Sequence, residues 1–229
     1  EVDRHLLPLL RTEVEPLGAR VVDADALVAD WDRIADPAKG GWSIVANLPY
    51  NVAVPLIVRL LETAPQVTTM LVMVQREVGE RLAAGPGSRA YGTVSVKVAY
   101  WAEARVLGSV SPQVFVPRPR VESVLVRLER RATPGCPPGE AGAPGVAIPV
   151  PGPGSPAYDW LFTVVRAGFA QRRKMLRRAL DGVVPPDAFD AAGVAPTARA
   201  EQLSLDDWCR LASAANEAAV PATEGSGGP

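Results

Sequence analysis

The first part of the chain alternates between strand-like and helix-like patterns of apolar residues. Runs rich in β-branched and other apolar residues predict strands over residues 19–23, 42–46, 67–74 and 121–128. Apolar residues at helical spacing predict helices over residues 3–11, 55–62 and 75–84, and residues 94–100 fit a helix that enters a strand near Arg105. Strands separated by helices favour an open, doubly wound α/β sheet, with the almost continuously apolar run 67–74 as a central parallel strand.

The last part of the chain has a different pattern. Residues 132–157 are rich in Pro, Gly and Ala and carry almost no charge, which predicts a linker or surface loop. After it the patterns are helical only, over residues 158–180, 186–191 and 205–215. Ser204, followed by two aspartates, predicts a capped start for the last helix. We therefore expect an α/β domain over 1–131, a linker over 132–157, a small all-α domain over 158–218 and a tail over 219–229.

Composition narrows the possible classes of function. The 229 residues include 24 basic and 25 acidic side chains, one His and two Cys. Two cysteines exclude a disulfide scaffold, and with a single His they leave no expectation of a zinc site. No stretch is apolar enough to predict a membrane span. We expect a cytoplasmic protein that works as a monomer, without a metal and away from membranes.

The sequence Asn47-Leu48-Pro49-Tyr50 directly follows a predicted strand. Ligands bind at the carboxyl ends of strands in α/β sheets. The Asn47 side chain and the Leu48 carbonyl offer acceptors for the two N–H groups of an adenine amine, and Tyr50 offers a ring on which an extruded base stacks. Pro49 stiffens the turn. The alternative is an ordinary strand-to-helix turn made of common turn residues.

A second segment, Phe115 to Ser123, contains two prolines that hold it extended before the last strand of the first domain. The segment presents Phe115 with little freedom, and its Arg118 and Arg120 are suited to meet phosphate. Phe115 as a plain core residue is the alternative.

Acidic residues near the amino end are candidates for binding a nucleoside. Glu1, at a strand end, has the position from which an acidic residue binds ribose hydroxyls in nucleotide-binding sheets. Asp25 follows the next predicted strand and is suited to accept from an adenine amine, a role that Asp23 also fits. Solvated turn carboxylates are the alternative for each.

The predicted helix over 158–180 carries a basic cluster at Arg172, Arg173 and Lys174, followed by Arg177 and Arg178. Residues 158–183 hold six basic and two acidic side chains, an excess that favours a phosphate-binding surface. A solvated face of an amphipathic helix is the alternative.

Five motifs in order resemble the bacterial small-subunit ribosomal RNA adenine dimethyltransferases, the KsgA family. They are Asn-Leu-Pro-Tyr, Gln75-Arg76-Glu77-Val78, Tyr91-Gly92 with Ser95-Val96, Phe-x-Pro-x-Pro-x-Val-x-Ser, and Phe169-x-Gln-Arg-Arg-Lys-x-Leu. The resemblance implies a class I Rossmann-like methyltransferase domain that uses S-adenosylmethionine, followed by a small helical domain that helps to hold RNA. It also implies dimethylation of two adjacent adenines near the 3′ end of small-subunit RNA, in the RNA itself or in an assembling small subunit.

The resemblance also implies roles for individual residues. Glu1 is expected to bind the cofactor ribose, Asp25 and Ala26 its adenine, and Asn47 to lie between cofactor and target. Asn47 and Leu48 are expected to hold the target amine, with Tyr50 and Phe115 stacking on the base. Arg172, Arg173 and Lys174 match the family's C-terminal signature, either as RNA contacts or as a brace between domains.

The chain departs from the family pattern in one respect. A Gly-rich cofactor loop, with its preceding strand and following helix, is absent from these 229 residues. We therefore expect a sheet that lacks its first strand, and an N-terminally truncated sequence that binds S-adenosylmethionine poorly.

Three other functions fit parts of the pattern. A large-subunit (23S) adenine methyltransferase of the antibiotic-resistance type shares the Asn-x-Pro-aromatic motif, although the Gln-Arg-Arg-Lys segment favours the small-subunit enzyme. A non-catalytic RNA-binding ribosome-assembly factor would not require Asn47 to Tyr50 or Phe115. A DNA adenine methyltransferase is the least favoured, because no segment suggests a sequence-reading domain.

Overall fold

The computed structural model describes residues 1–135 and 152–219, and these divide into two compact units. The sheet unit consists of residues 1–78 and 105–130. The helical unit consists of residues 79–104 together with the described residues from 131 onward.

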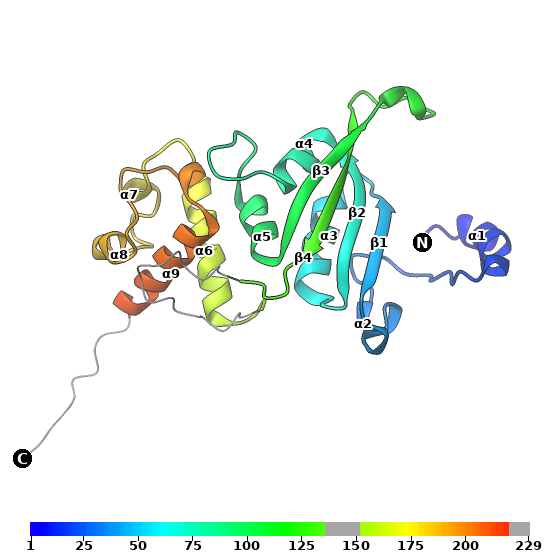
Figure 1. Ribbon diagram of the computed structural model, residues 1–229, viewed down its shortest axis with the longest axis horizontal. Helices are drawn as coiled ribbons and strands as arrows, with labels where there is room; N and C mark the ends of the chain where they lie inside the picture. Colours follow the sequence, from blue (N-terminus) through cyan, green and yellow to red (C-terminus); the bar gives the residue numbers. More distant parts are fainter. Residues whose placement is uncertain (136–151, 220–229) are drawn as a thin grey trace, which may run out of the picture. The chain divides into compact units, whose positions relative to one another are not determined.

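The sheet unit is built on four strands in the order β1-β2-β4-β3 (Figure 1). The strands are β1 (Trp42–Asn47), β2 (Val67–Gln75), β3 (Ala102–Val110) and β4 (Ser123–Arg130), and the first three residues of β3 belong to the helical unit. β1 and β2 pair in parallel, whereas β2 and β4 pair antiparallel. In the described part of the chain β1 lies at the edge of the sheet, and its Val45 is 78% exposed.

Short helices precede the first strand of this unit and lie between the later ones. They are α1 (Leu6–Val14), η1 (Glu15–Leu17), α2 (Trp31–Ile34), η2 (Pro37–Lys39), α3 (Ala53–Thr63), α4 (Arg76–Leu82), which crosses into the helical unit, and η3 (Pro112–Val114). The sequence predictions for α1, α3 and α4 and for β1, β2 and β4 are confirmed, with shifts of a few residues at their ends. The α/β fold class is therefore confirmed as well.

The core of the sheet comes from side chains that pair across β2 and β4. Met70 lies opposite Leu128, and Val72 lies opposite Val126, and all four are buried. Residues on the other face of β2 are only half-buried. β2 is thus central in position, as predicted, but a single face of it carries the tightly packed core.

The predicted strand over residues 19–23 is not present. Instead, the main-chain nitrogen of Glu1 donates to the carbonyl of Val22 at 3.0 Å, and the Ala24 nitrogen donates to the Glu1 carbonyl at 3.2 Å. Two bonds to a single residue do not make a ladder, and β-branched residues form a strand only where a neighbouring strand pairs with them. The prediction was wrong because the β propensity of residues 19–23 does not form a strand without a neighbouring strand to pair with.

Arg130, at the end of β4, holds the end of α3. Its guanidinium donates to the carbonyl oxygens of Leu60, Leu61, Ala64 and Val67 at 2.8–3.1 Å. The last carbonyls of a helix have no partners within the helix, so this side chain satisfies them and ties α3 to the sheet. Desolvation lowers the pKa of Arg130.

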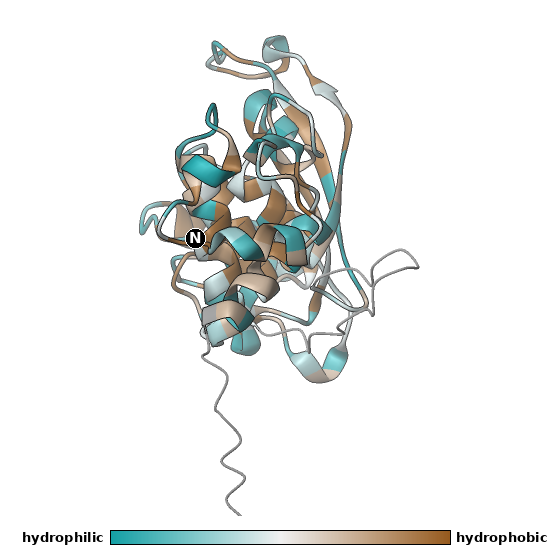
Figure 2. Cartoon of the chain, turned by 90° about the vertical axis from the view of Figure 1, so that its left-hand side faces the viewer, coloured by the Kyte–Doolittle hydropathy of each residue, from teal (hydrophilic) through white to brown (hydrophobic). Residues whose placement is uncertain are grey.

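The helical unit packs its helices around a common apolar centre. Its elements are α5 (Thr93–Trp101), α6 (Pro156–Ala170), α7 (Leu176–Ala179), α8 (Pro186–Ala191), η4 (Ala200–Gln202) and α9 (Leu205–Ala219). α6 contacts both α5 and α9, and Trp208, Phe162 and Tyr100 are fully buried between them. Figure 2 shows their apolar stretches in brown, gathered among the helices, with hydrophilic residues on the outer turns.

The predicted helix over residues 158–180 is divided in the structure. α6 ends at Ala170, and the chain then turns, with the Lys174 nitrogen donating to the Gln171 carbonyl at 2.8 Å. Met175 is extended and forms a bridge with Arg199. The basic cluster therefore lies in a turn and not on a helix, because this pairing with a distant segment competes with helix continuation.

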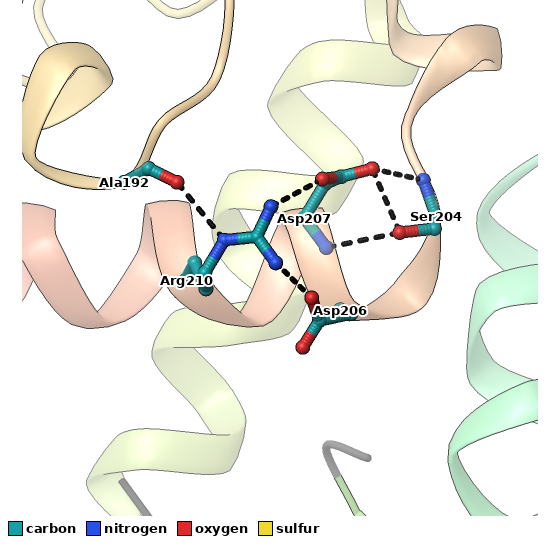
Figure 3. Close-up of polar contacts among 5 residues, drawn as sticks. All are labelled: Ala192, Ser204, Asp206, Asp207 and Arg210. Carbon is teal, nitrogen blue, oxygen red and sulfur yellow. Dashed lines mark hydrogen bonds and ion pairs between the residues drawn. The ribbon is translucent and has the colours of Figure 1, made fainter. Parts of the chain in front are cut away.

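The start of α9 follows the prediction closely (Figure 3). The Ser204 hydroxyl accepts from the Asp207 nitrogen at 3.1 Å, while an Asp207 carboxylate oxygen accepts from the Ser204 nitrogen at 2.8 Å. Arg210 donates to both Asp206 and Asp207, and also to the carbonyl of Ala192 at 2.9 Å. The reciprocal cap satisfies two main-chain donors, and Arg210 ties the α8 segment to α9.

The compact units do not follow the predicted domain boundaries in one place. Residues 79–104 group with the C-terminal helices, since α5 packs against α6 and α9. Most of the predicted linker, residues 136–151, lies outside the described residues, as do residues 220–229 of the predicted tail. The functional boundaries predicted from the sequence stay predictions.

Candidate functional site

Asn47 to Tyr50 form the tight connection between β1 and α3. Asn47 ends β1, and the Leu48 nitrogen continues the pairing by donating to the Met73 carbonyl at 3.2 Å. The Pro49 carbonyl accepts from the nitrogens of Val52 and Ala53, both at 3.1 Å. The turn is therefore fixed to the sheet on one side and to the start of α3 on the other.

The residues of this turn differ in their exposure. Leu48 is 7% exposed and fixes the turn, whereas Asn47 is exposed and Tyr50 is 49% exposed. Among the described residues, no group hydrogen-bonds to the Asn47 amide or to the Leu48 carbonyl. Both oxygens thus keep their capacity to accept a hydrogen bond.

The Phe115 segment follows η3 and leads into β4. Phe115 is half-buried, which is consistent with either role considered for it, while Arg118 and Arg120 are exposed. Neither arginine side chain forms a hydrogen bond or ion pair with another described group. The structure leaves both cations accessible to an anionic ligand.

Sequence reasoning missed an ion pair that holds this segment. Arg76 Nε donates to Glu122 Oε2 at 2.8 Å, and the Arg76 nitrogen donates to the Glu122 carbonyl at 2.9 Å. Arg76 comes directly after β2, so the pair links the end of β2 to the Phe115 segment. Both residues lie inside quoted motifs, and two charged residues of opposite sign at adjoining strand ends were the signal available.

Glu1 has a carboxylate held in place by the main chain. Its Oε1 accepts from the nitrogens of Val2 and Asp3, both at 2.8 Å, and these bonds lower its pKa. The second oxygen makes no bond with another described residue. A fixed, ionised carboxylate with a free oxygen suits ribose hydroxyls, which donate hydrogen bonds.

Val22 and Ala24 are hydrogen-bonded to the main chain of Glu1. These bonds bring the turn that follows, which contains Asp25 and Ala26, close to Glu1. Asp25 Oδ1 accepts from the Leu27 nitrogen at 2.8 Å, and the Ala26 carbonyl accepts from Trp31 Nε1 at 3.2 Å. The Ala26 main-chain nitrogen and the second carboxylate oxygen of Asp25, Oδ2, have no partner in the described chain. This donor and this acceptor match an adenine edge. Asp23 is exposed, so the structure leaves its alternative candidacy open.

The three basic residues of the C-terminal signature differ in their surroundings. Arg172 Nε donates to Glu201 Oε2 at 2.7 Å, and its Nη2 donates to the carbonyls of Ser88 and Arg89. Arg173 and Lys174 are exposed, and their side chains make no bond with another described residue. The cluster thus combines one arginine engaged with its own unit and two accessible cations.

Residues 1–135 and 152–219 contain no group of three or more His, Cys, Asp or Glu side chains arranged to hold a metal ion. No helix in this part of the chain has the length and apolar character needed to cross a membrane.

Comparison with known proteins identifies the family. Residues 1–139 match the sequence profile of ribosomal RNA adenine dimethylase. The chain belongs to this family. It is 49% identical over 176 residues to ribosomal RNA small subunit methyltransferase A of Acidothermus cellulolyticus, covering 75% of this chain and 54% of that protein. It is 42% identical over 228 residues to the enzyme of the same name from Leifsonia xyli, covering 93% of this chain and 72% of that protein.

These coverages mean that the chain spans about half the length of the first relative and under three quarters of the second. Two solved structures share the fold. A dimethyladenosine transferase from Plasmodium falciparum has a TM-score of 0.73 at 19% identity, covering 96% of this chain and 82% of that one. The 23S rRNA methyltransferase ErmE has a TM-score of 0.64 at 22% identity, covering 94% and 80%. The Rossmann-like methyltransferase fold expected from the sequence is confirmed.

Proposed function

We propose that this protein dimethylates the N6 amines of two adjacent adenines near the 3′ end of small-subunit (16S) ribosomal RNA, as part of small-subunit assembly. The observation that carries the proposal is the Asn47–Tyr50 turn, whose unpaired Asn47 amide and Leu48 carbonyl end a strand of a methyltransferase fold. The names of the relatives support the same substrate. The protein is expected to act in the cytoplasm as a monomer.

The chemistry needs positioning more than reactive side chains. The lone pair of an adenine amine is delocalised into the ring, which makes the amine a poor nucleophile. Acceptance of both N–H groups by Asn47 and Leu48 orients the amine and favours its pyramidal form. Tyr50 and Phe115 stack on the extruded base and hold it at the end of β1.

S-adenosylmethionine, when bound, supplies an activated methyl group for this transfer. The residues of the sheet unit fit a nucleoside: Glu1 keeps a free carboxylate oxygen for the ribose, and Asp25 with Ala26 keeps an acceptor and a donor for the adenine. Asn47 is the residue proposed to contact both cofactor and target. The RNA backbone is proposed to meet Arg118, Arg120, Arg173 and Lys174.

A large-subunit adenine methyltransferase is the second candidate, because ErmE shares the fold. The names of relatives at 42–49% identity favour the small-subunit substrate over it. A non-catalytic RNA-binding assembly factor is the third candidate. It would not need the unpaired acceptors of the Asn47–Tyr50 turn.

The test is to disrupt the gene in its own organism and map the dimethyladenosines of both ribosomal RNAs by reverse-transcription stops and mass spectrometry. We expect loss of two adjacent modifications near the 3′ end of small-subunit RNA. Loss of a large-subunit modification would favour the second candidate, and an unchanged modification pattern would favour the third.

The Asn47→Ala substitution, measured in the purified protein, tests the site itself. The purified variant should lose about 10²–10³-fold in turnover, as expected when one transition-state hydrogen bond is removed, while RNA affinity stays nearly unchanged. Asn51→Ala, four residues further on, is the matched control and should keep its activity. Retention of most of the rate by Asn47→Ala would contradict the role given to this residue.

A further inference from the structure

The segment Gly85 to Tyr91, here called the 85–91 loop, joins α4 to α5 and is tied to the C-terminal part of the helical unit. The Gly87 nitrogen donates to the Glu201 carbonyl at 2.7 Å. Arg172 Nη2 donates to the carbonyls of Ser88 at 3.3 Å and Arg89 at 2.7 Å. Two residues more than 80 positions further along the chain therefore fix the course of this loop.

Arg172 is itself held in this position. Its Nε donates to Glu201 Oε2 at 2.7 Å, and the two side chains are 36% and 33% exposed. Turning the guanidinium toward a ligand in solution would break the ion pair and both carbonyl bonds. The bonds that Arg172 makes are thus those of a side chain that organises the loop.

A ring contact fixes the end of the loop. Tyr91 is fully buried, and its ring meets the ring of Phe169 edge-on with 5.7 Å between the centroids. Phe169 lies near the end of α6, three residues before Arg172. The loop and the turn that follows α6 are consequently held side by side by polar and apolar contacts together.

Three exposed cations belong to the two segments that these bonds join. Arg89 is in the loop, and Arg173 with Lys174 directly follows Arg172. All three side chains are exposed, and none is hydrogen-bonded or ion-paired within the described part of the chain. The bond from Arg172 to the Arg89 carbonyl brings the two segments that carry these cations together, and a local excess of positive charge attracts an anionic ligand.

We infer that Arg89 is an RNA-phosphate contact that acts together with Arg173 and Lys174, and that Arg172 and Glu201 are positioning residues that hold it there. This inference rests on the proposed function for its choice of RNA as the ligand. Protein partners need apolar or aromatic residues at the centre of an interface. Residues 85–88 are Gly, Pro, Gly and Ser, which supply no aromatic ring and no large apolar side chain, so a backbone of phosphates is the better match.

The first experiment measures the affinity of the full chain for a labelled transcript of the 3′ end of small-subunit RNA at several salt concentrations. We expect Arg89→Ala to weaken binding several-fold and to reduce the slope of log K against log salt by about 0.7–0.9, the change for one lost phosphate contact. Arg89→Lys should keep most of the slope. Arg11→Ala, which removes an exposed cation of α1, is the control and should change neither value.

The second experiment separates positioning from contact. Arg172→Ala and Glu201→Gln are each made alone and combined with Arg89→Ala, and melting curves check that all variants fold. Arg172→Ala and Glu201→Gln should each weaken RNA binding when made alone. In the Arg89→Ala background, each should cause little further loss of affinity. A direct RNA contact by Arg172 predicts the opposite: an additive loss for Arg172→Ala, and unchanged or tighter binding for Glu201→Gln, which removes a negative charge.

The outcomes distinguish this inference from the proposed function. Unchanged affinity and slope in a folded Arg89→Ala variant would overturn the inference. Competition by a polyglutamate peptide as effective as that by RNA of equal charge would overturn the choice of RNA. Arg89→Ala could weaken RNA binding as expected while disruption of the gene leaves the dimethyladenosines intact. That combination would overturn the proposed function and leave the RNA contact of Arg89 standing.

Discussion

Gly168 lies directly against the indole ring of Trp208. A Cβ atom built at position 168 would lie 2.5 Å from Cη2 of that ring and 3.2 Å from Cζ3. Trp208 is fully buried and belongs to the core between α6 and α9. The absence of a side chain at position 168 therefore lets the two helices approach closely enough to enclose the ring.

Gly168→Ala should destabilise the helical unit by about 1–3 kcal/mol, because overpacking outweighs the gain in helix propensity. The free energy of unfolding measured in urea gives this value. In a Trp208→Phe background, where the clashing atoms are gone, the same substitution should cost much less. Equal costs in both backgrounds would show that the indole is not the obstacle.

Glu122→Gln should lower the methylation rate several-fold with little effect on stability, because it weakens the pair with Arg76 that holds the Phe115 segment. Exposed ion pairs contribute only about 0–1 kcal/mol to folding. Glu129→Gln is the matched control, since the Arg127–Glu129 pair has the same 2.7 Å separation and similar exposure. Similar rates for the two variants would remove any positioning role from Glu122.

Arg130→Leu should destabilise the sheet unit by about 1–3 kcal/mol, because its guanidinium donates to four carbonyl oxygens at and beyond the end of α3. Two of them, those of Leu60 and Ala64, keep the main-chain nitrogens of Ala64 and Val67 as donors. Arg130→Lys should recover only part of this loss, since a single ammonium group cannot reach all four. Arg127→Leu on the same strand, where the side chain is half-exposed, is the control for loss of a cation. Unfolding in urea provides the comparison.

The helical unit should lose stability at alkaline pH. Burial raises the pKa of Tyr100 from 10.0 to about 12, and burial with the nearby Asp207 raises the pKa of Tyr91 further. The folded state therefore holds its phenolic protons above the pH at which an unfolded chain releases them. The stabilisation is complete below about pH 10 and is lost as the pH rises toward 12.

The measurement is the melting temperature between pH 8 and 12, followed together with tyrosinate absorbance. Tyr100→Phe should flatten the decline above pH 10, because it removes one of the two groups whose ionisation favours unfolding. A decline of the same steepness in this variant would assign the alkaline transition to other groups.

Local sequence patterns predicted those elements whose partners are local or whose apolar residues are unambiguous. Residues 67–74 form β2 and residues 186–191 form α8, because a continuous apolar run and a proline-started helix leave few alternatives. The prediction of a strand over residues 19–23 was wrong, because the pairing of a strand with its neighbour depends on residues far away in the sequence. The helix predicted over 158–180 ends before Gln171 in the structure, because the Met175–Arg199 bridge joins segments that no local pattern connects.

The candidate site shows the same limit. The Asn47–Tyr50 turn was predictable, since its position after a strand and its residue types together suggest its chemistry. The partners of Arg172 were not, because two of its acceptors are main-chain carbonyls that every residue possesses. A basic cluster in a sequence does not reveal which of its members are engaged by their own protein.

That use of carbonyl groups has a consequence for how the 85–91 loop can change. Arg172 recognises the course of the main chain at Ser88 and Arg89, not the identity of their side chains. A substitution at Arg89 can therefore alter what the loop presents to a ligand without loosening the bonds that hold it, whereas the Ser88 hydroxyl also accepts from the Ala90 nitrogen at 3.2 Å. The loop separates the part that sets its shape from the part that sets its specificity, so related proteins are free to vary the second while the first stays constant.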